Sequence, residues 1–206
     1  MRQYIIKFPS EIIEYERQGR WDMAVEFAYE YWQAAPMELE RLLYAGIELW
    51  YSILEEDYYC SAPRQSEVRK TLAKFLPVLE LENKLAEVTR WGIEHFEDSP
   101  AFNLYFGYMM QVMPYFFLDY GGDYHGWREK GLAMQRRAYE MDPTNSLAKA
   151  MFYESYNCEK DALYREACTE LWKEITPEEW GDSEFQAYLF YILKGHFTHG
   201  DPYEKD

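Results

Sequence analysis

Apolar residues recur along this chain with the spacing of amphipathic helices. Trp21, Val25 and Ala28 lie three or four positions apart, and the same spacing recurs from Phe185 to Ile192. Such spacing places the apolar side chains on one face of an α-helix. No stretch of useful length alternates apolar and polar residues as a half-buried strand does. The pattern therefore predicts an all-α protein.

Prolines, glycines and capping residues divide this pattern into about ten helices. Ser10 is expected to cap the first helix, Gly19 to end it, and Pro36 to close the second. A loop is predicted at 57–63, and the sequence from Thr176 is a good helix start. The other predicted helices cover about 39–55, 66–76, 78–95, 100–114, 126–141, 146–157, 160–175 and 184–194. We expect a single domain over residues 1–206, ending in a polar tail at 196–206.

The stretch 101–118 carries no charged residue and reaches the lower limit for a membrane-spanning helix. It contains Asn103, Gln111 and Pro114, and acidic residues flank it where a span would have a basic cluster. We therefore expect a buried helix in the middle of the fold, and no membrane partner.

Small residues and prolines recur in two places with a spacing that suits paired helices. They are Gly19, Ala24, Pro36 and Gly46 in the first place, and Gly131, Ala138 and Pro143 in the second. Small residues let neighbouring helices approach closely, and proline ends a helix where the chain turns. In these placements the chain resembles a tetratricopeptide-repeat protein, and the middle of the chain matches through Gly107. The resemblance implies a right-handed superhelical array of antiparallel helix pairs that offers a surface for another protein.

Aromatic residues are unusually abundant. The chain has 20 Tyr, 12 Phe and 7 Trp among 206 residues, which is more than a core of this size must hold. Some of these rings are therefore expected on exposed or concave surfaces, where Tyr and Trp favour contacts with partners.

The charge balance is strongly acidic. Lys and Arg number 21 against 37 Asp and Glu, which gives a formal net charge of −16. This field repels nucleic-acid phosphates and anionic lipids, so neither is expected as a partner. A basic protein, attracted by electrostatic steering, fits the field better. An acidic surface that only supplies solubility is the alternative interpretation.

Cysteine usage favours a reducing compartment. Cys60, Cys158 and Cys168 are odd in number and show neither a C-x-x-C pair nor a dense disulfide framework. The N-terminal residues lack the apolar segment of a signal peptide. We expect a cytoplasmic protein, in a bacterial cell.

Two groups of residues have catalytic or metal-binding chemistry. His196, His199 and Asp201 could together hold a metal, although their spacing is loose and a solvated tail explains them as well. His125 could act as a general base oriented by Asp123, although glycine-rich connectors between helices are ordinary. We favour the structural interpretation of both groups.

The remaining catalytic patterns are missing from the sequence. No phosphate-binding glycine loop is present, and the cysteines have no recognisable histidine partner. His95, at a predicted helix end, is interpreted as compensating the helix dipole. We therefore assign no catalytic residue, no metal and no cofactor, and expect a protein that is not an enzyme.

Acidic clusters stand next to aromatic residues in three segments. The candidate binding residues are Glu55, Glu56, Asp57, Tyr58 and Tyr59; Glu94, Glu97 and Asp98; and Glu178, Glu179 and Trp180, with Asp182 and Glu184 following. Acids attract a basic partner and rings supply contact area. A solvated face with rings packed between helices is the alternative.

These patterns favour a non-enzymatic protein-binding module that engages a basic protein. In size and charge the chain resembles immunity-type proteins, which are small acidic helical inhibitors of cationic toxins, and this is the sharpest form of the hypothesis. The alternatives are a tetratricopeptide scaffold that holds an extended peptide in its groove and, less favoured, a helical metalloenzyme. The oligomeric state is left open.

Overall fold

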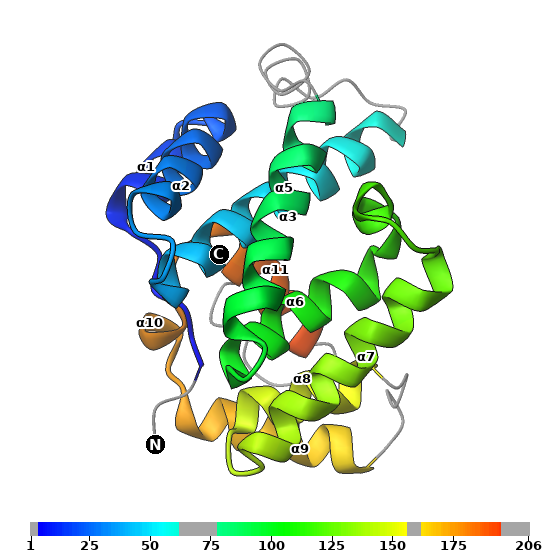
Figure 1. Cartoon of the computed structure of the whole chain (residues 1–206). Coiled ribbons are helices and arrows are strands. Elements are labelled where there is room, and N and C mark those ends of the chain that lie inside the picture. The colour runs from blue at the N-terminus through cyan, green and yellow to red at the C-terminus, as the bar shows by residue number, and fades with distance from the viewer. Residues whose placement is uncertain (1–3, 62–77, 156–161, 195–206) are drawn as a thin grey trace.

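A computed structural model describes residues 4–61, 78–155 and 162–194 of the chain (Figure 1). These residues form helices joined by short connections, and no strand occurs among them, which confirms the all-α class. The α-helices are α1 (Ser10–Arg17), α2 (Trp21–Ala34), α3 (Leu39–Ser61), α5 (Val78–Phe96), α6 (Pro100–Val112), α7 (Tyr124–Met141), α8 (Ser146–Ser155), α9 (Ala162–Glu174), α10 (Pro177–Trp180) and α11 (Glu184–Lys194), and the 3-10 helix η1 (Pro114–Tyr120) lies between α6 and α7.

Local capping chemistry sets several of the predicted boundaries. The Ser99 hydroxyl accepts the backbone N–H of Phe102, so α6 begins at the proline that follows this cap. Thr176 and Glu179 form a reciprocal capping box at the start of α10. Gly19 has a φ of 68°, a left-handed conformation that ends α1 where glycine is favoured. These helix starts and stops were predicted because each depends on a few adjacent residues.

Two boundary predictions are wrong. Pro9 precedes α1 at the capping position, and the Ser10 hydroxyl donates to the Glu11 carboxylate at 3.1 Å instead of capping the helix. The segment predicted as a loop at 57–63 is helical as far as Ser61, because no glycine or proline interrupts α3 before Pro63. The helix predicted at 66–76 lies outside the described residues.

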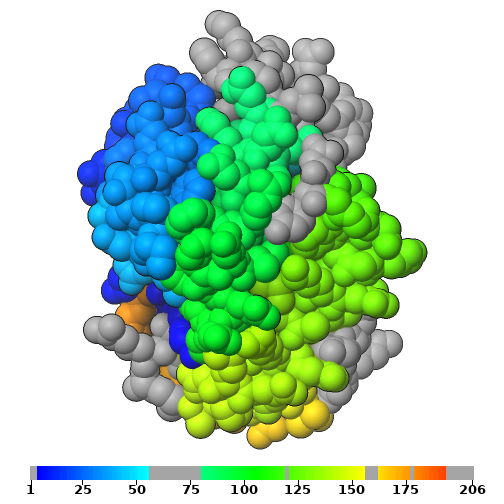
Figure 2. Space-filling model, viewed as in Figure 1, coloured from blue at the N-terminus to red at the C-terminus, as the bar shows by residue number. Residues whose placement is uncertain are grey.

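Helices that are neighbours in sequence mostly pack together, as α1 does with α2, α2 with α3, α7 with α8 and α8 with α9. Two helices depart from this order, because α6 also contacts α3 and α8, and α11 packs against both α3 and α8. Figure 1 shows α11 passing behind α5 and α6 in the middle of the molecule. In the space-filling view from the same side, the helices nearer the viewer form the surface, and the red of α11 is not visible (Figure 2).

The uncharged helix α6 lies in the interior, as predicted. Every residue from Phe102 to Met110 is buried. Within the part of the chain that the structure describes, no helix combines the length and the apolar character that a bilayer crossing requires.

Glycines bring α6 and α7 into backbone contact. A Cβ atom added at Gly131 would lie 2.6 Å from the Gly107 carbonyl oxygen and 2.6 Å from the Gln111 nitrogen. No side chain fits in that space, so the two helices can meet only because both positions are glycine. The small residues therefore act as the sequence suggested, by allowing close approach of paired helices.

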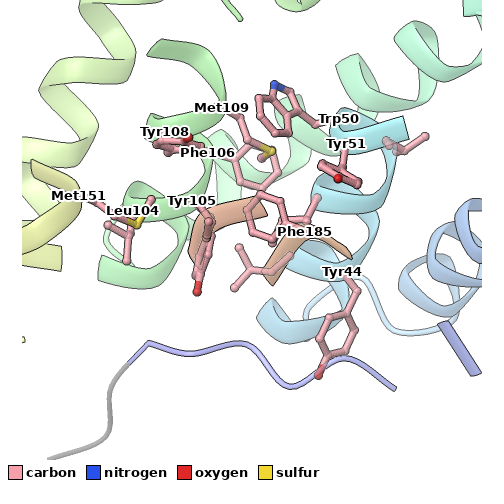
Figure 3. Close-up of a cluster of buried hydrophobic side chains, with 14 of the residues drawn as sticks. Tyr44, Trp50, Tyr51, Leu104, Tyr105, Phe106, Tyr108, Met109, Met151 and Phe185 are labelled. Atoms are coloured by element: carbon pink, nitrogen blue, oxygen red, sulfur yellow. The ribbon is translucent and has the colours of Figure 1, made fainter. Parts of the chain in front are cut away.

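Much of the aromatic excess is packed in the core. Trp50, Tyr108 and Phe185 are at most 1% exposed. Figure 3 shows Phe185 of α11 between Tyr51 of α3 and Tyr105 of α6. The Trp50 ring meets the Phe185 ring edge-on, with centroids 6.3 Å apart. These contacts join the N-terminal and C-terminal helices through aromatic packing.

The connection between α10 and α11 is also held to the start of the chain. The Gln186 side chain donates to the Ile6 carbonyl oxygen at 2.8 Å, and the Glu184 N–H donates to the Glu16 carboxylate at 3.3 Å. Arg17 and Asp182 form an exposed ion pair at 3.2 Å. The C-terminal helix therefore returns to α1, and the described chain is closed by contacts between distant segments.

Candidate functional site

A pocket of about 390 Å³ lies between α3 and α11. Its lining, which we call the tyrosine pocket, consists of Tyr51, Glu184, Ala187, Tyr188, Tyr191 and Ile192. The five residues from α11 recur from one helical turn to the next, three or four positions further along, so they form one continuous face of that helix. Tyr51 is contributed by α3. The pocket exists because α11 docks on α3 with this mixed aromatic and acidic face.

Two of the tyrosine rings are held in fixed positions. The rings of Tyr51 and Tyr188 have centroids 5.8 Å apart and are tilted by 53°. The hydroxyl oxygens of Tyr188 and Tyr108 are hydrogen-bonded at 3.0 Å, and the Tyr51 hydroxyl is hydrogen-bonded to the Glu55 carboxylate. Phe185 packs against both rings from the core. These contacts fix the walls of the pocket before any ligand binds.

The mouth of the pocket is open and acidic. Tyr191 is 66% exposed, and Glu184 is also exposed. No cationic residue is among the described residues that line the pocket. Burial, together with the nearby carboxylate of Glu55, raises the pKa of Tyr51, and burial raises the pKa of Tyr188. The phenols are therefore neutral at physiological pH, and the aromatic faces and the Glu184 carboxylate favour a cation.

Two buried carboxyl groups lie close to the pocket. Glu48 of α3 is fully buried and Glu16 of α1 is 5% exposed. Burial raises the pKa of Glu16 to about 8, and burial and the neighbouring Glu16 raise the pKa of Glu48 well above its usual value. Because two adjacent carboxylates cannot both be charged in an apolar interior, at least one of the two holds a proton at neutral pH. A charge on Glu16 acts on Tyr51 in the pocket wall and adds a small part to the rise of the Tyr51 pKa.

A second hollow, of about 640 Å³, lies beside α1. This α1 hollow is lined by Ser10, Glu11, Ile13, Glu14, Tyr15, Arg17 and Asp182. Its charge is partly neutralised within the chain, because Arg17 pairs with Asp182. The two hollows approach each other at the start of α11, where Asp182 lines one and Glu184 lines the other. Together they make an acidic surface with exposed or half-buried tyrosines.

The first predicted acidic cluster contributes one described side chain to this surface. Glu55 is half-buried and bonds Tyr51, as described above. The backbone of Glu56, Asp57, Tyr58 and Tyr59 belongs to α3, and their side chains lie outside the described part of the structure.

The second cluster lies elsewhere and is used within the fold. Glu94, Glu97 and Asp98 are exposed at the end of α5 and in the turn that follows. Arg137 of α7 pairs with the Glu97 carboxylate at 3.0 Å and with the Asp98 carboxylate at 2.5 Å. Two of these three acids therefore already have a cationic partner.

The third cluster is divided between capping, the core and the pocket. The Glu179 carboxylate accepts the Thr176 N–H at 2.9 Å as part of the capping box. Trp180 is 2% exposed, and its ring nitrogen donates to the Gln186 carbonyl oxygen, so its ring is not accessible to a partner. The side chain of Glu178 lies outside the described part. Glu184 is the member of this segment that reaches the tyrosine pocket.

The candidate histidines do not assemble a site within the described part. His125 is exposed, and the Asp123 carboxylate caps α7 by accepting the Gly126 N–H at 3.0 Å. His95 stacks on Trp91 with ring centroids 4.0 Å apart. His196, His199 and Asp201 lie outside the described residues. Among the residues that are described, no group of three or more His, Cys, Asp and Glu side chains is placed to share a metal ion.

The described cysteine is unreactive. Cys168 is a buried free thiol, and burial raises its pKa to about 11. A thiol that stays protonated at neutral pH is a poor nucleophile. Cys158 and the side chain of Cys60 lie outside the described part.

Sequence reasoning did not single out Tyr51, Tyr188 or Tyr191. The signal for the α11 residues was present in the spacing of Glu184, Tyr188 and Tyr191, which puts an acid and two rings on one helical face. The signal for Glu48 was a carboxyl group within an otherwise apolar run. Neither pattern indicates that α11 docks on α3.

In comparisons with known proteins, no family model matches the chain, and no similar curated protein or solved structure was found.

Proposed function

We propose that this chain is a non-enzymatic binding module whose acidic, tyrosine-rich surface around the start of α11 engages a basic protein. The observation that carries the proposal is the tyrosine pocket, where preformed aromatic walls lie next to the exposed carboxylate of Glu184. Interfaces are typically anchored by aromatic residues in pockets and steered by complementary charge. The formal net charge of −16 supplies a long-range field of the required sign.

The proposal also includes a tetratricopeptide-like architecture for the chain and a location in the bacterial cytosol. Sequential packing of neighbouring helices and the close approach at Gly107 and Gly131 support that architecture. The buried free thiol of Cys168 suits a reducing compartment. In its sharpest form, the partner is a cationic toxin that this chain inhibits by occupying a basic surface.

The test is affinity capture from the native organism, followed by binding kinetics with the purified partner. We expect a basic protein whose association rate falls at least about tenfold between low and physiological salt, because steering by exposed charge is screened. Glu184→Lys should weaken capture. Glu129→Lys is the matched control, since it makes the same charge change at an exposed position of α7 that lines neither hollow.

Two results would count against the proposal. One is capture of an acidic partner or peptide. The other is binding of a basic partner that responds equally to Glu184→Lys and Glu129→Lys, because that would make the effect a matter of net charge and not of this surface.

A further inference from the structure

Resting on the proposed function, we propose that the tyrosine pocket receives the guanidinium group of one arginine from the basic partner. In this arrangement the guanidinium lies against the rings of Tyr188 and Tyr191 and pairs with the carboxylate of Glu184. The arginine would be the anchor of the interface, and the remaining acidic surface would steer it into place.

The pocket has the dimensions and openness for one side chain. Its volume of about 390 Å³ lies in the lower part of the range for ligand pockets. Its rim contains the exposed ring of Tyr191, so a side chain can enter from solvent. Its wall includes Ala187 and Ile192, which suit the aliphatic stem of an arginine while the charged head reaches the acid.

The carboxylate of Glu184 lies at the rim of the pocket. Among the described residues, Glu184 makes no ion pair, and its backbone N–H is the group that contacts Glu16. By contrast, Asp182 in the α1 hollow is already paired with Arg17. Charge complementarity therefore favours the tyrosine pocket over the α1 hollow as the place for an external cation.

The same molecule already binds an arginine with this set of groups. The guanidinium carbon of Arg41 lies 3.9 Å from the centroid of the Tyr31 ring, and its Nε bonds the Glu38 carboxylate at 2.6 Å. A tyrosine face and a glutamate thus hold one arginine on the surface of α2 and α3. The tyrosine pocket offers the same two groups, with a second ring in addition.

Arginine fits these groups better than lysine. A guanidinium is planar and weakly hydrated, so it can stack on a ring and bond a carboxylate in its own plane at the same time. Within this chain, the Lys84 ammonium lies 4.9 Å from the Tyr29 ring centroid and the Lys130 ammonium 5.1 Å from the Trp127 ring centroid. Both are farther from their rings than Arg41 is from Tyr31.

The test uses a defined probe and the full chain. Nα-acetyl-arginine N-methylamide is titrated while the aromatic NMR signals of Tyr188 and Tyr191 are followed. The matching lysine and citrulline derivatives are titrated in parallel, because citrulline keeps the shape of arginine without its charge. We expect the arginine probe to bind in the millimolar range and to shift both signals, with weaker binding of lysine and none of citrulline.

Variants assign the binding to the pocket. Glu184→Gln should weaken the arginine probe about fivefold to tenfold, and Tyr191→Ala about threefold, because one removes a charge-assisted hydrogen bond and the other a ring face. Both positions are exposed, so the fold should be retained. Glu129→Gln, the matched control, should leave the affinity unchanged.

The outcomes separate this inference from the proposed function. Equal binding of the lysine or citrulline derivative, or no shift of the two signals, overturns the arginine pocket. So does a captured basic partner whose affinity is unaffected by Tyr191→Ala, although the proposed function would then stand. If the arginine probe behaves as expected but no basic protein is captured, the pocket stands and the proposed function fails.

Discussion

Replacement of Glu16 by glutamine tests the buried carboxyl pair. Glu16 is 5% exposed, and one of its oxygens accepts the Glu184 N–H at 3.3 Å. Glutamine has nearly the same shape, its carbonyl oxygen can accept the same N–H, and it cannot ionise. Glu16→Gln therefore removes the titration of this position while keeping the contact that holds the start of α11.

The sign of the effect follows from the pKa of Glu16, which burial raises from 4.5 to about 8. Between these values the folded chain keeps a proton that the unfolded chain has lost. Folding is then coupled to proton uptake at Glu16. The contribution of this group to the free energy of unfolding is therefore fully present below pH 4.5 and falls as the pH rises towards 8. The variant should not show this part of the decrease.

The size of the stability change follows from the interval between the two pKa values of Glu16. Each pH unit above 4.5 costs about 1.4 kcal/mol for one such group, which gives roughly 3 kcal/mol at pH 7. We expect Glu16→Gln to raise the free energy of unfolding by about 2 to 3 kcal/mol at pH 7 and to leave it nearly unchanged at pH 4. Urea unfolding across this pH range measures the difference.

The control is Glu26→Gln, an exposed position on α2 that is not among the groups that shift the pKa of Glu16 or Glu48. It should leave stability within about 0.5 kcal/mol of wild type at every pH. The reasoning is refuted if the gain from Glu16→Gln does not grow between pH 5 and pH 8, or if the variant is less stable than wild type at pH 7.

Three further predictions concern the helices. Gly131→Ala puts a Cβ atom 2.6 Å from backbone atoms of α6 and should lower the free energy of unfolding by about 2 kcal/mol or more in urea. Gly126→Ala is the control and should change it by less than about 1 kcal/mol, because the nearest atom to its Cβ is a carboxylate oxygen of Asp123 at 3.7 Å. Asp123→Ala removes the cap of α7 and should lower it by about 1 kcal/mol, and unchanged stability would contradict that role. Iodoacetamide should leave Cys168 unmodified in the folded chain, as peptide mapping would show, and rapid alkylation without unfolding would contradict its burial.

Helix positions were predictable from the sequence because their signals are local. A serine before a proline at Ser99, a capping box at Thr176 and a left-handed glycine at Gly19 each act over a few residues. The helix α3 continues through the acidic and tyrosine residues that follow Glu55, past the start of the loop predicted at 57–63. Those residue types do not stop a helix in the absence of glycine, proline or a competing cap.

The site could be predicted only in its chemistry. Acid beside aromatic residues was anticipated, yet the structure pairs Tyr51 with Tyr188, which are far apart in sequence. The same long-range packing decides which acidic side chains stay available to a partner, because Arg137 forms ion pairs with Glu97 and Asp98. Helical periodicity gives the faces of each helix but not the docking of one face on another, so neither the pocket nor the place of Glu184 at its rim could be derived from spacing alone.

The buried pair and the pocket are connected, which makes a last prediction possible. Glu16 bonds the backbone of Glu184, and its charge influences Tyr51 in the pocket wall. At pH 7 Glu16 is protonated, so Glu16→Gln should leave the affinity for the arginine probe unchanged. Above its pKa of about 8 the wild-type carboxyl ionises and adds a negative charge near the pocket, and wild type should then bind the probe more tightly than the variant.

NMR titrations at pH 7 and about pH 8.5 measure both affinities, with Glu26→Gln as the control. Equal affinities at the higher pH would mean that the pair affects stability alone. A loss of affinity already at pH 7 would mean that Glu16 positions Glu184 through a hydrogen bond to its backbone N–H that glutamine does not reproduce.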